Sequence, residues 1–543
     1  MAKKVIRQLT TGVHDFPGLI QDEESKYVDK TDLLYELARH KKDAQYFISR
    51  PRRFGKSLML STLQAMFEGR RDLFKGLKID AEDWEGWTTP TPVYSFTMSE
   101  ANGGTFEEVQ ESLSDLVDGL YEEAGIPVPE KGTAPGKFTK FLKLAAGKSP
   151  TGKIVILIDE YDEPVAGFLD DLSTLRKVRK LLHDFYEKLK VNSGSIRFLM
   201  MTGVTKLTKL SVFSGLNHLK DRSSDPRFAT LLGYTPQELD GALRENVEAL
   251  GKKLGKDFKA TKQAILDWYD GYRFSPDSTA RVCNPVSLGS AFENGKLEGY
   301  WESTGQTTLV LGRVAKAGKL PDDLEHVLAD KMMLDVCDAA SLPMESLLYQ
   351  GGYLTIKDVI PGPPDKYILA PPNLEVRSSL MRGFVSQILH LKETAFDTLL
   401  DRARNLIAVG DIREVVETML FSLYAQVPPD WQIRDEAEAK RYFQLFFSML
   451  GADPAPEFPS VRGYADAVVE TPDNVFVVEF KYRRSSRAAM KQIRDCGYAD
   501  KWRGGPRPVT LVGVNFNPAK RNIDIPIVEP LGTDPPRRLG GGA

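Results

Sequence analysis

The chain has 543 residues, too many for a single hydrophobic core, so its length predicts about three or four domains. Lys and Arg total 72 and Asp and Glu total 75, a net charge of −3, which excludes an overall basic field that would attract nucleic acid or anionic lipid. The three cysteines are widely spaced, which is atypical of a zinc knuckle or a secreted disulfide framework. Because the chain has no overall basic field, any surface that binds nucleic acid must be local.

Apolar runs in this chain are short. None reaches the length of about 18 residues that a membrane-spanning helix needs. Residues 1–10 (MAKKVIRQLT) lack the apolar core of an export signal. With the odd number of cysteines, these features predict a cytoplasmic protein that does not enter a membrane.

Residues 46–60 (YFISRPRRFGKSLML) have the pattern of a buried strand, a tight loop and the first turns of a helix. This order predicts a phosphate-binding loop, in which backbone N–H groups at a helix N-terminus hold the phosphates. Gly55 lets the main chain approach, Lys56 reaches the β and γ phosphates, and Ser57 offers its hydroxyl to Mg²⁺. Arg50 stands where the usual pattern G-x-x-x-x-G-K-[ST] has its first glycine. The alternative is a chance Gly-Lys-Ser at the start of a surface helix.

A second motif completes the predicted ATP site. Residues 154–158 (IVILI) have the length and character of a central parallel strand, and they end in Asp159-Glu160. In a P-loop enzyme the first acid holds Mg²⁺ together with Ser57, and the second orients or deprotonates the attacking water. The alternative is a strand that ends in solvated acids, and the order of the two motifs disfavours it. The loop residues predicted to bind ATP are Arg50, Pro51, Arg52, Arg53, Phe54, Gly55, Lys56, Ser57 and Leu58.

Residues 196–201 (IRFLMM) predict a third buried strand, which ends in Thr202-Gly203. We assign Thr202 to the ATP site, where it either senses the γ-phosphate or only initiates a turn. Strands and helices alternate across residues 1–240, which predicts an α/β domain with a parallel sheet.

The character of the chain changes after this domain. Residues 241–390 predict a connector of helices with a small winged sheet, whose two short strands fall within residues 347–370. Within it, residues 268–274 (WYDGYRF) form an aromatic cluster that is either a core or a seat between domains. Residues 391–523 are predicted to form a separate C-terminal domain, and residues 524–543 a flexible tail.

Residues 466–481 (DAVVETPDNVFVVEFK) predict a β-hairpin that turns at the segment TPDN. This turn places Asp466 directly opposite Glu479, and Lys481 shares the face of Glu479 because strand side chains repeat every two residues. Two opposed carboxylates repel each other, which raises the pKa of one of them unless a cation lies between them.

Mg²⁺ is the natural cation for this pair, because it takes carboxylate oxygens and waters as ligands. Asp466 and Glu479 are therefore the predicted metal ligands, and Lys481 is predicted to position or activate the attacking water. On the following helix Gln492 can line the same site, and Glu438 is the nearest acid on the preceding helix. The alternative is an E-x-K sequence on the solvated edge of a strand.

With both sites placed, the chain resembles the bacterial and archaeal AAA-ATPase-like family that carries a C-terminal PD-(D/E)XK nuclease domain of the DUF1703 type. The resemblance implies a P-loop NTPase parallel sheet, a helical or winged connector and a C-terminal α/β restriction-endonuclease-like domain. In this family RPRRFGKS is the usual form of the phosphate loop. The motifs that carry the resemblance lie in order across residues 15–516 and are YVDKT, RPRRFGKSL, LFKGLKI, LIDEYDEP, TGV, FSGLNHLKD, WYDGYRF, LLYQGGYLTI, GYADAVVE, VVEFKY and QIRDCGYADKW.

One departure from the family concerns the helix before the hairpin. The family tends to show Glu-x-x-Tyr-His there, whereas this chain has Ala439 and Phe443 on either side of Tyr442. The chain thus lacks the glutamate and the histidine of this family motif, so the resemblance does not imply full nuclease activity.

These features together predict an ATPase fused to an Mg²⁺-dependent DNA endonuclease or exonuclease that acts in mobile-element biology or in defence against foreign DNA. Its predicted cofactors are ATP and Mg²⁺, its predicted partners are nucleotide and DNA, and a homo-oligomer is left open. The alternative is a nucleotide-driven switch or scaffold, whose nuclease-like domain only binds nucleic acid or a partner. The retained Asp466, Glu479 and Lys481 favour the nuclease, and the missing acid and histidine favour the scaffold.

Overall fold

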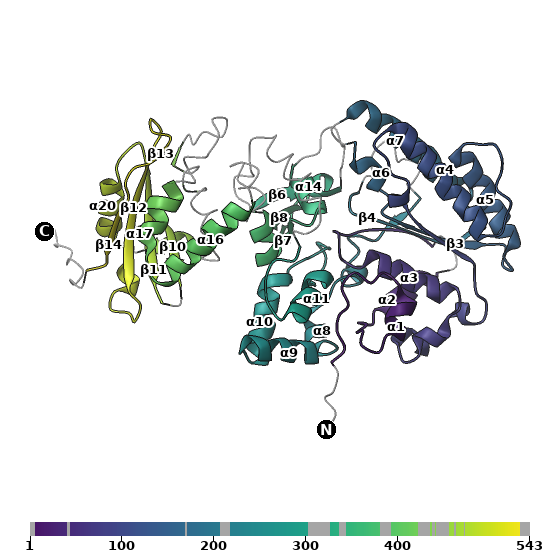
Figure 1. Ribbon diagram of the computed structural model, residues 1–543, viewed down its shortest axis with the longest axis horizontal. Helices are drawn as coiled ribbons and strands as arrows, with labels where there is room; N and C mark the ends of the chain where they lie inside the picture. The colour runs from purple at the N-terminus through teal and green to yellow at the C-terminus, as the bar shows by residue number, and fades with distance from the viewer. Residues whose placement is uncertain are drawn as a thin grey trace, which may run out of the picture. The chain divides into compact units, whose positions relative to one another are not determined.

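The computed structural model of the chain forms two compact units (Figure 1). The first unit comprises Met1–Thr304 and Pro321–Arg377, and the second comprises Gly305–Leu320 and Ser378–Ala543. Among the described residues, no helix is both long and apolar enough to cross a membrane. The residues that the structure describes are 6–40, 44–168, 171–206, 218–301, 326–335, 344–380, 393–421, 435–436, 440, 455–460, 463–471 and 473–532.

The first unit is organised around a five-stranded sheet in the order β2-β3-β4-β1-β5. Its neighbouring strands all pair in parallel, which confirms the predicted α/β fold. Strand β3 is buried along its whole length, as expected of a parallel strand with helices on both faces. The strands are β1 (Gln45–Ser49), β2 (Val93–Thr97), β3 (Ile154–Asp159), β4 (Ile196–Gly203) and β5 (Lys220–Asp221).

Helices lie on both faces of this sheet (Figure 1). Helices α4, α5 and α7 share one continuous apolar core with the strands. Helix α3 packs against β3 from the other side, and α1 packs on α3. Because α3 begins at Lys56, the phosphate loop lies at the carboxyl end of β1. The helices are α1 (Phe16–Gln21), α2 (Thr31–Ala38), α3 (Lys56–Phe67), α4 (Phe106–Glu123), α5 (Ala134–Lys148), α6 (Glu163–Ala166) and α7 (Leu172–Val191).

The rest of the first unit consists of a helical segment and a three-stranded antiparallel sheet in the order β6-β8-β7. The two short strands predicted from the sequence are β7 and β8, and β6 is a third strand that the sequence did not predict. The helices α8 to α11 enclose a core of their own, which includes Leu243 and Val247. The elements are α8 (Pro236–Asp240), α9 (Arg244–Leu254), α10 (Phe258–Tyr269), α11 (Pro285–Asn294), β6 (Val327–Asp330), α13 (Lys331–Asp335), α14 (Met344–Gln350), β7 (Thr355–Ile360) and β8 (Lys366–Ala370).

The second unit contains a mixed sheet in the order β13-β12-β11-β10-β9, with β14 paired to β12. Strands β11 and β12 are parallel, and the other pairs are antiparallel. This mixed sheet agrees with the predicted restriction-endonuclease-like domain. The elements are α16 (Glu393–Ala408), α17 (Ile412–Glu414), β9 (Ala455–Ser460), β10 (Gly463–Glu470), β11 (Val475–Tyr482), α20 (Ser486–Cys496), β12 (Val509–Asn517), β13 (Asn522–Ile523) and β14 (Ile527–Pro530).

The predicted tail begins too early in the sequence. Strand β14 lies inside residues 524–543 and pairs with β12, so its backbone is held by the sheet. Ile527 and Leu531 also pack against the apolar core of the second unit. Burial of these two side chains stabilises a strand in a stretch that Pro and Gly made appear unstructured.

Helix α20 lies directly against the sheet at Gly513 of β12. A Cβ atom at this position would lie 2.6 Å from the carbonyl oxygen of Ser486 and 2.9 Å from the backbone nitrogen of Met490. Both distances are shorter than a real Cβ contact, so glycine is required for this close approach. Gly513 is also the residue of β12 that pairs with Glu479 of β11.

Candidate active sites

The phosphate loop of the first unit opens into a cavity of about 620 Å³. Gly55 caps α3 with a positive φ of 86°, and Arg53 has a φ of 66°, so two residues of the loop take the left-handed conformation. The cavity has the size of a small-molecule site. The residues lining it come from the loop, from the N-terminal segment and from the helical segment, and include Leu9, Gly12, Tyr27, Arg52, Arg53, Phe54, Gly55, Lys56, Ser57, Leu58, Glu160, Leu232, Tyr234 and Val286.

Arg50 and Pro51 border a separate, small pocket instead of this cavity. The Arg50 guanidinium is buried and donates to the carbonyl oxygens of Ser223 at 2.8 Å and Phe228 at 3.3 Å. It also lies over the ring of Phe274, 4.0 Å from the ring centroid. The prediction that Arg50 binds ATP is therefore wrong for its side chain, which points inward because these carbonyls accept from its two terminal nitrogens and this ring lies against it. The aromatic cluster accordingly serves as a core behind the loop.

Replacing Arg50 with methionine should lower the free energy of unfolding of the first unit by about 2–4 kcal/mol, because buried carbonyl oxygens would lose their donor. Arg52→Met is the matched control in the same loop. Arg52 pairs with Glu163 at 2.9 Å and keeps a 31% exposed side chain, so its loss should cost less than about 1 kcal/mol. Chemical denaturation of both variants measures the difference, and equal stabilities would refute the structural role of Arg50.

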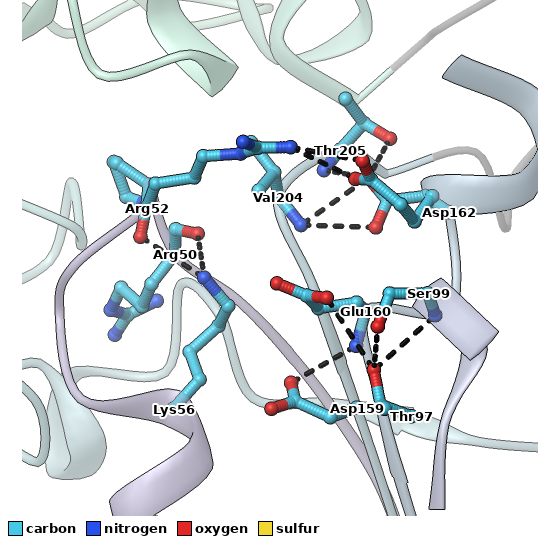
Figure 2. Close-up of polar contacts among 12 residues, drawn as sticks. Arg50, Arg52, Lys56, Thr97, Ser99, Asp159, Glu160, Asp162, Val204 and Thr205 are labelled. Carbon is cyan, nitrogen blue, oxygen red and sulfur yellow. Dashed lines mark hydrogen bonds and ion pairs between the residues drawn. The ribbon is translucent and has the colours of Figure 1, made fainter. Parts of the chain in front are cut away.

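Lys56 is a second buried cation of the loop, and unlike Arg50 it lines the cavity. Its Nζ donates to the carbonyl oxygens of Arg50 and Pro51, each at 3.1 Å (Figure 2). Burial lowers the pKa of Lys56, and the nearby carboxylate of Asp159 opposes that shift. The ammonium group thus lies inside the loop that is predicted to hold the phosphates.

Asp159 is held by two hydroxyl groups from different elements. Ser57 Oγ donates to its Oδ2 at 2.5 Å, and Thr202 Oγ1 donates to its Oδ1. Thr202 lies within β4 and is buried, so it does not initiate a turn, and its hydroxyl orients Asp159. Mg²⁺ bound with a nucleotide takes one or two carboxylates, phosphate oxygens and waters. The hard oxygen donors of Ser57 and Asp159 fit such an ion.

Glu160 follows Asp159 with a φ of 50°, a strained conformation for a residue with a side chain. Thr97 Oγ1, at the end of the neighbouring strand, donates to Glu160 Oε2 at 3.4 Å (Figure 2). Asp162 accepts hydrogen bonds from the backbone nitrogen of Thr205 at 2.7 Å and from its hydroxyl at 2.5 Å. The sequence analysis did not assign Thr97, Asp162 or Thr205 to the site, although Asp162 lies within the LIDEYDEP motif.

The hairpin of the second unit has the predicted register. Ala467 pairs with Val478 and Glu470 with Val475, and the same register places Asp466 opposite Glu479. Asp466 Oδ2 accepts a hydrogen bond from the Phe480 backbone nitrogen at 2.7 Å. The two carboxylates therefore lie across from each other on neighbouring strands.

Lysines alternate with carboxylates around this pair. Lys481 Nζ donates to Glu479 Oε1 at 2.7 Å and lies 3.6 Å from Glu436 Oε1. Lys440 Nζ lies 2.5 Å from Asp466 Oδ1 and 3.5 Å from Glu436 Oε1. Each of the two opposed carboxylates therefore has a lysine ammonium group beside it, which offsets their repulsion.

Glu479 is the most deeply buried member of this network, with a side chain that is 1% exposed. Burial raises the pKa of Glu479 to about 7, and the negative charge of Asp466 adds to the shift. Its Oε2 finds no hydrogen-bond partner among the described residues. A buried oxygen without a donor fits a ligand to a divalent cation, although no group of three acidic, His or Cys side chains in the described parts of the chain is arranged to hold one.

The upstream acid at this site is Glu436, whereas Glu438 lies outside the described residues. Glu436 Oε2 also accepts from the Tyr482 backbone nitrogen at 3.2 Å. The i, i+4 spacing of Glu436 and Lys440 is a sequence signal that could have indicated both residues.

Gln492 lies on α20, as predicted, and its Nε2 donates to the hydroxyl of Tyr498 at 3.0 Å. Burial raises the pKa of Tyr498 to about 12, and the negative charge of Glu479 adds to this shift. Gln492 thus contacts Tyr498, a residue that senses the charge of Glu479. We still treat its part in catalysis as a prediction.

The first unit has the fold of an AAA-ATPase-like domain, and the second has the fold of a PD-(D/E)XK nuclease-type domain. The family model described as predicted AAA-ATPase matches residues 10–213, and the model described as PD-(D/E)XK nuclease superfamily matches residues 434–525. A protein of Azotobacter chroococcum mcd 1, described as an uncharacterized protein in the vnfD 5'region, is 30% identical over 539 residues, which span 97% of this chain and 99% of that protein. The chain therefore belongs to the family of predicted AAA-ATPases with a C-terminal domain of the PD-(D/E)XK nuclease superfamily, which confirms the resemblance.

Proposed function

We propose that the chain hydrolyses ATP in its first unit and cleaves DNA with Mg²⁺ in its second. The observation that carries the nuclease is the opposed pair of Asp466 and Glu479, with Lys481 bound to the buried carboxylate. The ATPase is supported by the cavity that Lys56, Ser57 and Glu160 line together.

In the ATP site, each residue has a distinct role. Lys56 would exchange its two carbonyl acceptors for phosphate oxygens, which are stronger acceptors for an ammonium group. Ser57 and Asp159 would hold Mg²⁺, which supplies charge neutralisation of the phosphates when bound. Glu160 would accept a proton from the attacking water or orient it, and Thr202 would keep Asp159 in place.

In the nuclease site, Asp466 and Glu479 would hold Mg²⁺, which polarises the scissile phosphate and lowers the pKa of a bound water. Lys481 lies next to Glu479, where its ammonium group can orient the attacking water and stabilise charge on the phosphate. Three exposed arginines follow it closely, Arg483, Arg484 and Arg487. They supply the local basic surface that DNA phosphates require in a chain of negative net charge.

Cleavage of supercoiled and linear duplex DNA by the full chain tests this function. We expect degradation that requires Mg²⁺, stops with a chelator and responds to ATP. The use of both DNA forms separates endonuclease from exonuclease activity. If no DNA is cleaved with Mg²⁺ or Mn²⁺, with or without ATP, the nuclease proposal fails.

Glu160→Gln should keep ATP binding and slow hydrolysis by about 10²-fold or more, because it removes the base and leaves Asp159 intact. Glu100→Gln, an exposed acid beside β2, is the matched control and should hydrolyse ATP at the parental rate. Calorimetry measures binding, and phosphate release measures turnover. A parental rate in Glu160→Gln would show that Glu160 is only an acid at the end of a strand.

A second candidate, a nucleotide-driven switch or scaffold, is favoured by the ammonium group of Lys440 on Asp466. In that case the second unit binds nucleic acid or a partner without cleaving it. For either function we propose a cytoplasmic protein of mobile-element biology or defence, a role that rests on the resemblance alone. We keep the predicted domain borders 1–240, 241–390 and 391–523 as proposals, together with an open possibility of homo-oligomers.

A further inference from the structure

We propose that Lys440 is a built-in counter-ion of the nuclease site, whose ammonium group occupies the position of the divalent cation at Asp466 and must leave before that cation binds. The inference rests on the proposed function, because it requires Asp466 and Glu479 to be metal ligands. It adds a residue that lowers the affinity of the site for the metal.

The two oxygens of Asp466 are engaged differently. Oδ2 accepts from the Phe480 backbone nitrogen at 2.7 Å and is therefore fixed by the hairpin itself. Oδ1 has the Lys440 ammonium group at 2.5 Å. Since Mg²⁺ sits at about 2.1 Å from its oxygen ligands, an ion on Oδ1 and this ammonium group would be two like charges in nearly the same place. One of them excludes the other.

Lys440 differs from Lys481 in its freedom to move. The side chain of Lys481 is 8% exposed and also donates to the Phe480 carbonyl oxygen at 2.6 Å, so its departure would leave a buried carboxylate unpaired. The side chain of Lys440 is 28% exposed and can swing into solvent. The site therefore has one open ligand atom, Glu479 Oε2, and one that is closed by a movable lysine.

Lys440→Met tests this role through Mn²⁺ binding to the nucleotide-free full chain, measured by the loss of the free-ion signal in electron paramagnetic resonance, with Asp159→Asn in every protein, parent included, to remove the predicted ligand of the first unit. We expect binding about tenfold tighter than in the parent, equivalent to about 1.4 kcal/mol. Without metal the variant should unfold at a lower temperature than the parent, because Asp466 loses its ion pair, and Mn²⁺ should raise this temperature more than in the parent. Lys440→Gln serves as the second uncharged variant if Lys440→Met does not fold.

Two further variants separate a local effect from a change in net charge. Lys440→Arg keeps the positive charge and should bind Mn²⁺ as the parent does. Lys520→Met removes another lysine of the same unit, which pairs with Asp524 at 2.8 Å, and should also leave Mn²⁺ affinity unchanged. Tighter binding in Lys520→Met equal to that in Lys440→Met would overturn the proposal, since any lost charge would then suffice.

The Asp466→Asn variant distinguishes a failure of the Lys440 role from a failure of the metal site on which that role depends. If Asp466→Asn loses Mn²⁺ binding that the parent has, while Lys440→Met binds as the parent does, the counter-ion role of Lys440 fails and the metal site stands. If Asp466→Asn and the parent bind Mn²⁺ equally, the metal site fails and the role of Lys440 fails with it. Tightening in Lys440→Met that disappears in the double variant with Asp466→Asn supports both.

Discussion

Replacing Lys56 with alanine should abolish ATP binding and leave the first unit folded. Lys56 is a buried cation at the phosphate loop, and a triphosphate that loses such a partner loses about 3 kcal/mol or more, at least a hundredfold in affinity. The loop loses two hydrogen bonds to buried carbonyls, but the variant also no longer buries an ammonium group, so the net cost in stability should stay below about 2 kcal/mol. Titration calorimetry with Mg²⁺ and ATP measures the affinity.

Lys140→Ala is a suitable control for Lys56→Ala. Lys140 is exposed on α5 and should bind ATP with parental affinity. Thermal unfolding of both variants checks that the first unit remains intact. Parental ATP affinity in a folded Lys56→Ala variant would refute the assignment of this loop as the nucleotide site.

The second large effect is expected at the hairpin, where Glu479→Gln and Lys481→Gln should separate metal binding from chemistry. Glu479→Gln removes a ligand, so both the stabilisation by Mg²⁺ and DNA cleavage should disappear. That stabilisation is about 2.7 kcal/mol at one hundred times the dissociation constant. Lys481→Gln keeps a donor near Glu479 Oε1 and should retain the stabilisation while cleavage falls by about 10²–10⁴-fold.

The thermal measurements on these two variants belong in an Asp159→Asn background without nucleotide, because Asp159 and Ser57 are also predicted to hold Mg²⁺. Cleavage is followed in the otherwise unchanged chain. If Glu479→Gln keeps the full stabilisation by Mg²⁺, the hairpin does not hold the metal. If Lys481→Gln cleaves DNA at the parental rate, Lys481 takes no part in the chemistry.

The sequence predicted those parts of the fold that depend on local pattern. The parallel sheet followed from the alternation of apolar strands with helices, and the register of Asp466 and Glu479 followed from a short turn and a period of two. Ser57 and Asp159 were brought together because carboxyl ends of parallel strands meet at one edge of a sheet. These inferences needed no knowledge of how distant segments pack.

What the sequence did not predict depends on partners that lie far away along the chain. Arg50 turns toward Ser223, Phe228 and Phe274, and no local pattern shows that these groups surround it. Lys440 reaches Asp466 through a long flexible side chain from another element. Strand β14 exists because β12 offers it a free edge. Each of these outcomes is decided by tertiary contact rather than by propensity.

The absence of a side chain at Gly513 fixes the distance between α20 and the sheet beside Glu479. Because no methyl group separates α20 from β12, the backbones of the helix and the strand meet at the residue that pairs with Glu479. Gln492 lies on this helix and donates to Tyr498, so a side chain at position 513 would move Gln492 away from the sheet together with α20. One hydrogen atom at position 513 thus sets the spacing between helix and sheet on which the position of Gln492 depends.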